Sequence, residues 1–207
     1  MNKTEPRDQL IRKFSAPICA AALVGLLLLA LATRFWLADW PNFKPIAAVA
    51  IFAGYFCERK SLALIAVVAI MLVSDAVIGF YEPLIMASVY ASLLLACGLG
   101  MLMQKRLRVD SKMFSKIGSI SAAALVASVL FYLLTNTAVW AAGWYPADLN
   151  GWIAALVAGL PFFKFTLAGN LLFSCLLFSL YFASWTATVD THQRADALSA
   201  NQIRNLG

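Results

Sequence analysis

The sequence predicts an all-α, polytopic membrane protein, and two observations carry this prediction. Of its 207 residues, 62% are hydrophobic and 13% are charged, whereas a soluble domain averages about 45–50% and about 25%. The mean hydropathy is +0.81, and several apolar runs approach the roughly 20 residues that a helix needs to cross about 30 Å of hydrocarbon. An ordinary soluble enzyme is therefore excluded.

Six membrane spans are predicted. Apolar runs lie at residues 17–33, 45–57, 61–80, 84–104 and 117–141, followed by a longer stretch at 152–187. The second run is short, about 20 Å as a helix, and could begin outside the hydrocarbon or be irregular. The last run would extend about 54 Å, which is too long for one span. We therefore expect a short, partly immersed segment at 151–160 and a sixth span at 161–184, with Pro161 in its first turn.

The basic residues predict the orientation of these spans. With the N-terminus in the cytoplasm, thirteen of the 16 Lys and Arg residues lie on the cytoplasmic side, whereas Arg34 and Lys44 lie opposite and Lys164 lies within the last apolar stretch. This bias places both termini in the cytoplasm. Residues 1–187 then form one six-helix domain with a cytoplasmic segment at 1–16, and residues 188–207 form a polar cytoplasmic tail, either a short helix or disorder.

No motif for catalysis or metal binding is present in the sequence. The four cysteines form no CxxC pair, His192 is alone in the tail, and Walker A, HExxH and GxSxG motifs are missing. We expect no enzymatic activity, no metal and no cofactor. The basic residues are scattered between the spans, so nucleic acid is not an expected partner. Active transport would need an ATPase from another chain.

The connections on the predicted outer side, at residues 34–45, 79–83 and 142–152, are rich in aromatic residues and proline. Such residues commonly form the aromatic belt at a membrane interface. Alternatively, they surround a flat or ring-containing ligand. The aromatic residues in question are Trp36, Trp40, Phe43, Tyr81, Trp144, Tyr145 and Trp152.

Four polar residues lie within the outer halves of the predicted spans: Asp75, Asn136, Lys164 and Asn170. Polar groups in hydrocarbon are costly unless they are paired or functional. Asp75 and Lys164 could form a structural ion pair, and the two asparagines could form hydrogen bonds between helices. Their shared depth favours a ligand cavity that opens to the outside and is closed below by apolar side chains.

Small residues recur at four-residue spacing on several spans. Ala16 and Ala20 begin such a stripe on the first span, which continues with Ala21 and Gly25, and the pairs Ala87/Ala91 and Ala123/Ala127 lie on later spans. This spacing allows helix backbones to approach closely. Internal packing is one use of such a stripe, and docking to another membrane subunit is the alternative.

Several short motifs carry a family resemblance over residues 40–180. These are Pro41-Asn42-Phe43 with Pro45, Ala47 and Ala48; Phe52 with Gly54; Ser74-Asp75 with Gly79; Thr135-Asn136 with Trp140; Tyr145-Pro146; and Pro161-Phe162-Phe163. In this order they resemble a family of small bacterial inner-membrane proteins of uncharacterised function. That family in turn resembles the substrate-binding S components of energy-coupling factor transporters for vitamins.

The resemblance implies a subunit that captures a vitamin or related micronutrient outside the membrane. It would topple in the bilayer when coupled to a transmembrane T subunit and two ATPases, with Ala16 and Ala20 as the docking positions. Cobalamin is the first substrate to test, although no cysteine is expected at the outer mouth to bind cobalt. The predicted ligand contacts are Trp40, Asn42, Phe43, Asp75, Tyr81, Asn136, Trp140, Lys164 and Asn170.

Two other functions fit the same sequence features. A structural or assembly protein would use its helices and aromatic rims to bind a membrane partner instead of a small ligand. An intramembrane enzyme acting on lipid is disfavoured, because the sequence offers no paired nucleophile and base.

Overall fold

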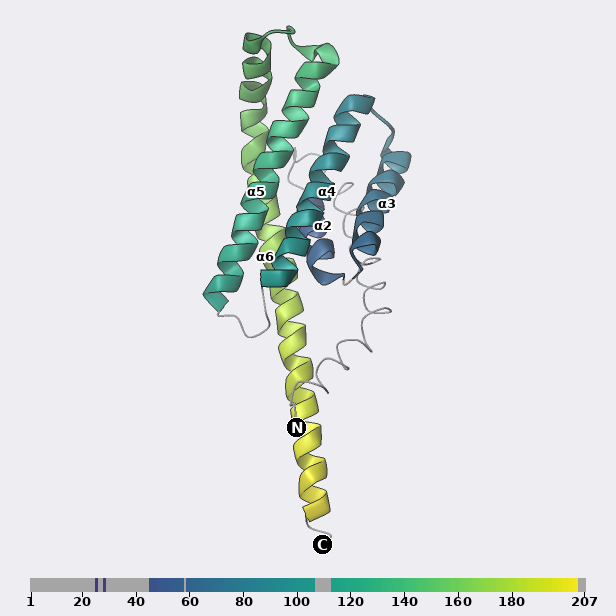
Figure 1. Cartoon of the computed structure of the whole chain (residues 1–207), viewed down its shortest axis with the longest axis vertical. Helices are drawn as coiled ribbons and strands as arrows, with labels where there is room; N and C mark the ends of the chain where they lie inside the picture. Colours follow the sequence, from purple (N-terminus) through teal and green to yellow (C-terminus); the bar gives the residue numbers. More distant parts are fainter. Residues whose placement is uncertain (1–24, 26–27, 29–44, 58, 107–112, 205–207) are drawn as a thin grey trace.

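The computed structural model describes residues 25, 28, 45–57, 59–106 and 113–204. In these ranges the chain forms helices and no strand, which confirms the predicted all-α class for the described part. The elements are α2 (Ile46–Phe56), α3 (Lys60–Ile78), α4 (Pro83–Arg106), α5 (Met113–Val139), the π-helical turn η1 (Trp140–Trp144) and α6 (Leu149–Arg204). Figure 1 shows them in one elongated bundle, with α6 continuing far beyond the other helices at its C-terminal end.

Four of the described helices are long and apolar enough to cross a membrane: Lys60–Ile78, Pro83–Gln104, Ser115–Trp144 and Leu149–Ala183. The chain is therefore a helical membrane protein. The apolar helix α2 has 11 residues and is only about 17 Å long, as its short apolar run predicted. The predicted first span at 17–33 falls outside the described residues except at two single positions.

The predicted break before Pro161 is wrong. The chain from Leu149 to Arg204 is one helix of 56 residues with Pro161 in its interior. The prediction assumed that a helix must end near the membrane surface, whereas α6 accommodates its length by extending past the bundle (Figure 1). Residues 188–204 of the predicted tail continue α6 as helix, and a helix is one of the two conformations expected for this tail.

The connection between α3 and α4 has clear local causes. Gly79 ends α3 with φ of 114°, a backbone conformation that is readily available to glycine. Its N–H still donates to the carbonyl of Asp75 at 2.8 Å. Pro83 takes the first position of α4, where its missing N–H costs nothing, and the carboxylate of Glu82 accepts a hydrogen bond from the Ile85 N–H at 2.8 Å.

The bundle has two distinct ends. We call the end with the α3–α4 and α5–α6 connections the hairpin end, and the end with the α2–α3 connection and the projecting part of α6 the tail end (Figure 1). At the tail end, the Gln104 side chain donates to the carbonyl of Cys57 at 3.5 Å. This hydrogen bond joins the last turn of α4 to the end of α2.

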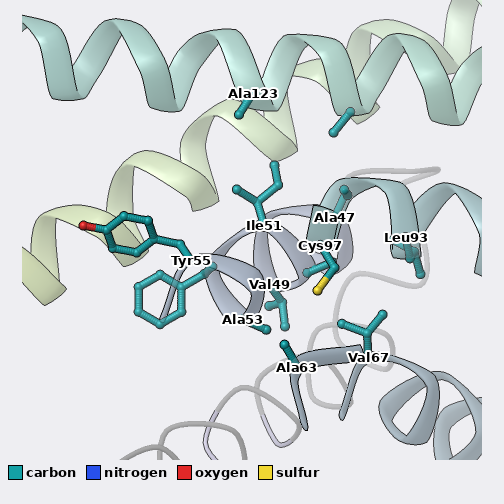
Figure 2. Packing of buried hydrophobic residues seen from close by; sticks show 14 of the residues in the cluster. Ala47, Val49, Ile51, Ala53, Tyr55, Ala63, Val67, Leu93, Cys97 and Ala123 are labelled. Atoms are coloured by element: carbon teal, nitrogen blue, oxygen red, sulfur yellow. The ribbon is translucent and has the colours of Figure 1, made fainter. Parts of the chain in front are cut away.

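The short helix α2 is enclosed by the other helices. Nine of its residues, from Ala47 to Tyr55, are buried. Figure 2 shows its side chains among Ala63 and Val67 of α3, Leu93 and Cys97 of α4, and Ala123 of α5. On the α6 side, a cluster of stacked and edge-on rings fills the tail end; it consists of Phe52, Tyr55 and Phe56 with Phe178, Tyr181 and Phe182.

Two glycines allow α2 and α4 to lie backbone against backbone. A Cβ at Gly54 would overlap with the Cys97 carbonyl, and a Cβ at Gly100 would overlap with the Ile51 carbonyl. No side-chain rearrangement can relieve these overlaps, because the opposing atoms belong to backbone. Glycine is therefore required at this crossing for steric reasons.

The small-residue pairs have different surroundings. Ala123 and Ala127 are buried inside the bundle, where they serve packing, whereas Ala87 and Ala91 of α4 are exposed. The pair Ala16 and Ala20 falls outside the described residues.

Candidate functional site

The buried polar residues of α6 lie at the depth where α2 begins. The two helices run in the same direction, because Phe52 packs on Phe178 and, one turn on, Phe56 packs on Tyr181, with ring centroids 5.3 and 5.6 Å apart. Ser174 and Asn170 precede Phe178 by about 6 and 12 Å along α6, and Ile46 precedes Phe52 by about 9 Å along α2. The two polar side chains therefore flank the level of the first residue of α2.

A buried chain of hydrogen bonds joins α6 to α5 at this level. The Asn170 amide Nδ2 donates to Ser128 Oγ at 2.9 Å, and Ser128 Oγ donates to the Ala124 carbonyl at 2.7 Å. Asn170 is 1% exposed, and Ser128 and Ser174 are fully buried. Ser174 Oγ has no hydrogen-bond partner among the described residues, which is unusual for a buried hydroxyl.

A second polar pair joins α3 to α4. Tyr90 donates its hydroxyl hydrogen to Asp75 Oδ2 at 2.9 Å, and Asp75 is 1% exposed. Along α3, Asp75 lies about 22 Å from Lys60 at the tail end. The first residue of α2 lies about 17 Å from the same end, so Asp75 is slightly closer to the hairpin end. We call Asp75, Tyr90, Ser128, Asn170 and Ser174 the polar layer.

Asn136 lies closer to the hairpin end, between α5 and α6. Its Nδ2 donates to the Tyr132 carbonyl of its own helix at 2.7 Å. Its side-chain amide fills the space above Gly159, where an added Cβ would overlap with it. This asparagine is therefore packed against the α6 backbone.

Tyr132 supports the turn of α6 that precedes Pro161. Its hydroxyl donates to the Leu156 carbonyl at 2.6 Å, and its ring packs on Phe163 with centroids 5.1 Å apart. Proline removes the N–H that would pair with the carbonyl of residue 157 and crowds the preceding turn. The Tyr132 hydroxyl bonds the carbonyl next to the one that proline leaves unpaired, so it attaches this turn of α6 to α5.

The α5–α6 connection forms a rigid corner. Gly143 has φ of 85°, which allows the chain to leave η1 without strain on a side chain. Trp140 Nε1 donates to the Pro146 carbonyl at 2.9 Å, and Trp152 Nε1 donates to Thr137 Oγ1 at 3.0 Å. Asp148 caps α6 by accepting the Gly151 N–H on Oδ1 at 2.7 Å.

A shallow, open groove lies over this corner. It encloses about 510 Å³ and is mostly apolar, and its lining residues are Thr137, Trp140, Ala147, Asp148, Leu149 and Trp152. We call it the corner groove. Among the predicted contacts that the structure describes, only Trp140 lies in it, and Trp152 belongs to the aromatic residues that the sequence placed at this end.

The predicted contact residues occupy separate places. Asp75 and Asn170 are buried in the polar layer, Asn136 and Trp140 lie nearer the hairpin end, and Tyr81 lies in the exposed α3–α4 connection, 37% exposed. Lys164 is exposed, with Nζ 5.0 Å from the centroid of the Phe165 ring, and it does not pair with Asp75. Trp40, Asn42 and Phe43 fall outside the described residues.

Sequence reasoning missed four residues of these sites: Tyr90, Ser128, Ser174 and Asp148. Serine is common in membrane helices, so the two serines gave no distinctive signal. Tyr90 lies one turn before Leu93, in the middle of an apolar run, and a hydroxyl there needs a hydrogen-bond partner. This need could have identified Tyr90 as part of a polar site.

No group of three potential metal ligands occurs among the described residues. Of the cysteines there, Cys57 and Cys97 are buried and Cys175 is exposed. Cys97 and Cys57 belong to the packed tail end of the bundle.

The fold and these sites define a small helical membrane protein with a buried polar layer. Comparison of the sequence with known families places it further: residues 15–192 match the family of unknown function DUF6580, and the chain belongs to this family. No curated protein and no solved structure is significantly similar to it.

Proposed function

We propose that this protein is the substrate-binding subunit of a vitamin or micronutrient transporter of the energy-coupling factor type, with six spans and both termini in the cytoplasm of a bacterium. The observation that carries the proposal is the polar layer. A layer of polar side chains from α3, α4, α5 and α6, buried except for the half-buried Tyr90, lies at the level where the half-length helix α2 begins. An ionisable residue such as Asp75 within a membrane helix is by default a candidate for a functional site.

The tail end closes the proposed site from below. The aromatic cluster and the glycine-mediated contact between α2 and α4 fill that end with apolar side chains and backbone. A ligand entering from the hairpin end would therefore stop at the polar layer. Asp75 and Asn170 are its principal polar contacts in this proposal, and Asn136 and Trp140 lie along the path toward them.

Uptake requires that the ligand bind in the outward state and leave after reorientation. A partner can drive this change only by favouring the state with lower ligand affinity. In our proposal a T subunit docks on the small-residue stripe at Ala16 and Ala20, and its two ATPases supply the energy.

The decisive experiment is native mass spectrometry of the protein purified in lipid nanodiscs, first without additions and then with cobalamin. We expect a small molecule of constant mass to copurify, or cobalamin to bind. An empty protein that binds neither cobalamin nor any of the other B vitamins would refute the proposal. Growth of a vitamin auxotroph on limiting vitamin, with and without the gene, then identifies the substrate.

Two substitutions test the polar layer as a ligand site. Asn170→Ala and Asp75→Ala should lower ligand affinity at least about tenfold, because each removes a buried polar partner, while the protein still inserts into the membrane. Leu172→Ala is the control, since this side chain of the same helix is 57% exposed and is not a predicted ligand contact. Unchanged affinity together with a lower melting temperature would assign Asp75 and Asn170 to structure alone.

An assembly protein is the second candidate, and one observation favours it: the polar layer is partly paired with itself, through Asn170–Ser128 and Tyr90–Asp75. Interhelical hydrogen bonds of this kind contribute about 0.6 kcal/mol on average. A double-mutant cycle on Asn170→Ala and Ser128→Ala measures this coupling. A stable stoichiometric partner in an otherwise empty preparation would support this candidate.

The proposed orientation has its own test. A reporter that is active only outside the cytoplasm, fused at Gly143, should be active, and a cytoplasmic reporter fused at the C-terminus should fluoresce. The opposite result at either position would reject the orientation that the basic residues predict.

A further inference from the structure

Of the residues that line the corner groove, the proposed function uses only Trp140, and the groove has features of a separate ligand site. Both of its indole N–H groups are already occupied, by the Pro146 carbonyl and by Thr137 Oγ1. Each tryptophan is thereby fixed in orientation, and what it offers to the groove is aromatic carbon surface. Rings that are fixed in advance lose little conformational entropy when a ligand binds.

The groove also contains one carboxylate. Asp148 is exposed, and its Oδ1 accepts the Gly151 N–H, so Oδ2 remains available to a ligand. It makes no ion pair within the described part of the chain. The positive end of the α6 dipole, equivalent to about half a charge, offsets only part of the carboxylate charge.

In the two connections at the hairpin end, the charged residues that the structure describes are both acidic. Glu82 and Asp148 lie there, whereas Arg59, Lys60 and Lys116 lie toward the tail end. Lys164 is about 22 Å along α6 from Leu149. Arg34 and Lys44, which the sequence assigns to this side, are outside the described residues.

The groove lies at the hairpin end of the bundle, where α5 connects to α6. The apolar helix that ends at Trp144 has 30 residues, about 45 Å, against about 30 Å of hydrocarbon. Figure 1 shows the α5–α6 hairpin extending past the α3–α4 connection. We therefore take the aqueous phase, and not the lipid, as the source of a ligand for this groove.

From these observations we propose that the corner groove binds a small organic cation from solution, a quaternary ammonium or a cationic ring, between Trp140 and Trp152 with its charge toward Asp148. Aromatic faces attract such cations, and a nearby carboxylate adds charge complementarity. The inference does not depend on the polar layer, so it can hold where the transport proposal fails.

The test uses the full-length protein labelled with 5-fluorotryptophan, in nanodiscs of phosphatidylglycerol, which carries no ammonium group. Fluorine NMR signals of the two residues are assigned with Trp140→Phe and Trp152→Phe. Tetramethylammonium is then titrated, and tert-butanol serves as its uncharged analogue of similar size. We expect both signals to shift with tetramethylammonium, with at least about fivefold weaker binding of tert-butanol.

Two charge-neutralising variants locate the effect. Asp148→Asn keeps an N-cap acceptor for Gly151 and should weaken tetramethylammonium binding about three- to tenfold. Glu82→Gln removes the same charge from the other connection at this end and should leave binding unchanged. Equal weakening by both variants would mean that surface charge alone attracts the cation, and it would overturn the proposal.

Two further outcomes would also overturn it. Equal binding of tetramethylammonium and tert-butanol would show that the groove does not recognise positive charge, and the two tryptophans would then be part of the aromatic belt. Loss of the tetramethylammonium response in phosphatidylcholine nanodiscs would mean that a lipid headgroup occupies the groove, against the aqueous source. A response that persists in those nanodiscs supports the proposal.

Discussion

The helices α2 and α3 are adjacent in sequence and both strongly apolar, yet their surroundings differ. Nine of the 11 residues of α2 are buried, against six of the 19 residues of α3. Protein surrounds α2 on every side, whereas α3 packs along one face, and its other side chains, Leu72 and Val73 among them, remain exposed. Apolar composition therefore places a helix in the membrane region but does not say whether protein or lipid surrounds it.

The largest expected effect lies at the closest contact of α2. Gly54→Ala should destabilise the protein by about 3 kcal/mol, because its methyl group would overlap with the Cys97 carbonyl and force the two backbones apart. Gly98→Ala is the matched control, since a Cβ there meets nothing within 4 Å. Thermal unfolding in detergent, with size-exclusion chromatography as the readout, measures the stability of both variants. Similar melting temperatures would show that α2 is not enclosed as described.

The next effect is in the aromatic cluster that packs α2 against α6. Phe178 is fully buried, and Phe178→Ala should cost about 2–3 kcal/mol by leaving a cavity. The same substitution costs about 3–5 kcal/mol in the cores of soluble proteins. We expect a lower cost here, because the side chain would otherwise be surrounded by lipid and not by water. Leu180→Ala, at a side chain 60% exposed, should change little in the same unfolding assay.

A smaller effect is expected where α3 is attached to α4. Tyr90→Phe removes the hydroxyl that donates to Asp75 and should destabilise the protein by about 1 kcal/mol. Hydrogen exchange should show faster opening of α3 than of α2, because α3 has the smaller buried surface. Equal acceleration in both helices would contradict the separation of these two regions.

The smallest effect is expected on the exposed face of α3. Val73 is 45% exposed, and Val73→Ala should change stability by less than about 0.5 kcal/mol. A cost near that of Phe178→Ala would instead show that another chain, or a segment outside the described residues, covers this face. Crosslinking from a cysteine at position 73 would then identify the covering segment.

Helix positions were largely predictable from the sequence. The predicted runs 61–80 and 84–104 correspond to Lys60–Ile78 and Pro83–Arg106, because a membrane helix is a long apolar run bounded by polar or turn residues. The continuity of α6 was not predictable, because the length rule assumes an end at the membrane surface. Pro161 indicated a helix start, because proline is favoured in the first turn of a helix. The contact of Tyr132 with this turn of α6 comes from another helix and is not visible in the local sequence.

The candidate site was predictable only in part. Asp75 and Asn170 stood out because carboxylates and amides are rare in apolar runs, and both are buried. Lys164 gave the same sequence signal but is exposed. The direction in which a side chain points cannot be read from an apolar helix whose two faces, toward lipid and toward protein, have similar residues.

The unbroken helix α6 gives the protein a lever. The helix continues toward Arg204 beyond the other helices (Figure 1), and its residues 184–204 alone span about 32 Å. A rod of that length converts rotation into displacement: a tilt of the bundle by about 10° would carry the Arg204 end through about 5–6 Å. Reorientation within the bilayer would thus become a translation at the far tip, where a partner could read it without touching the membrane.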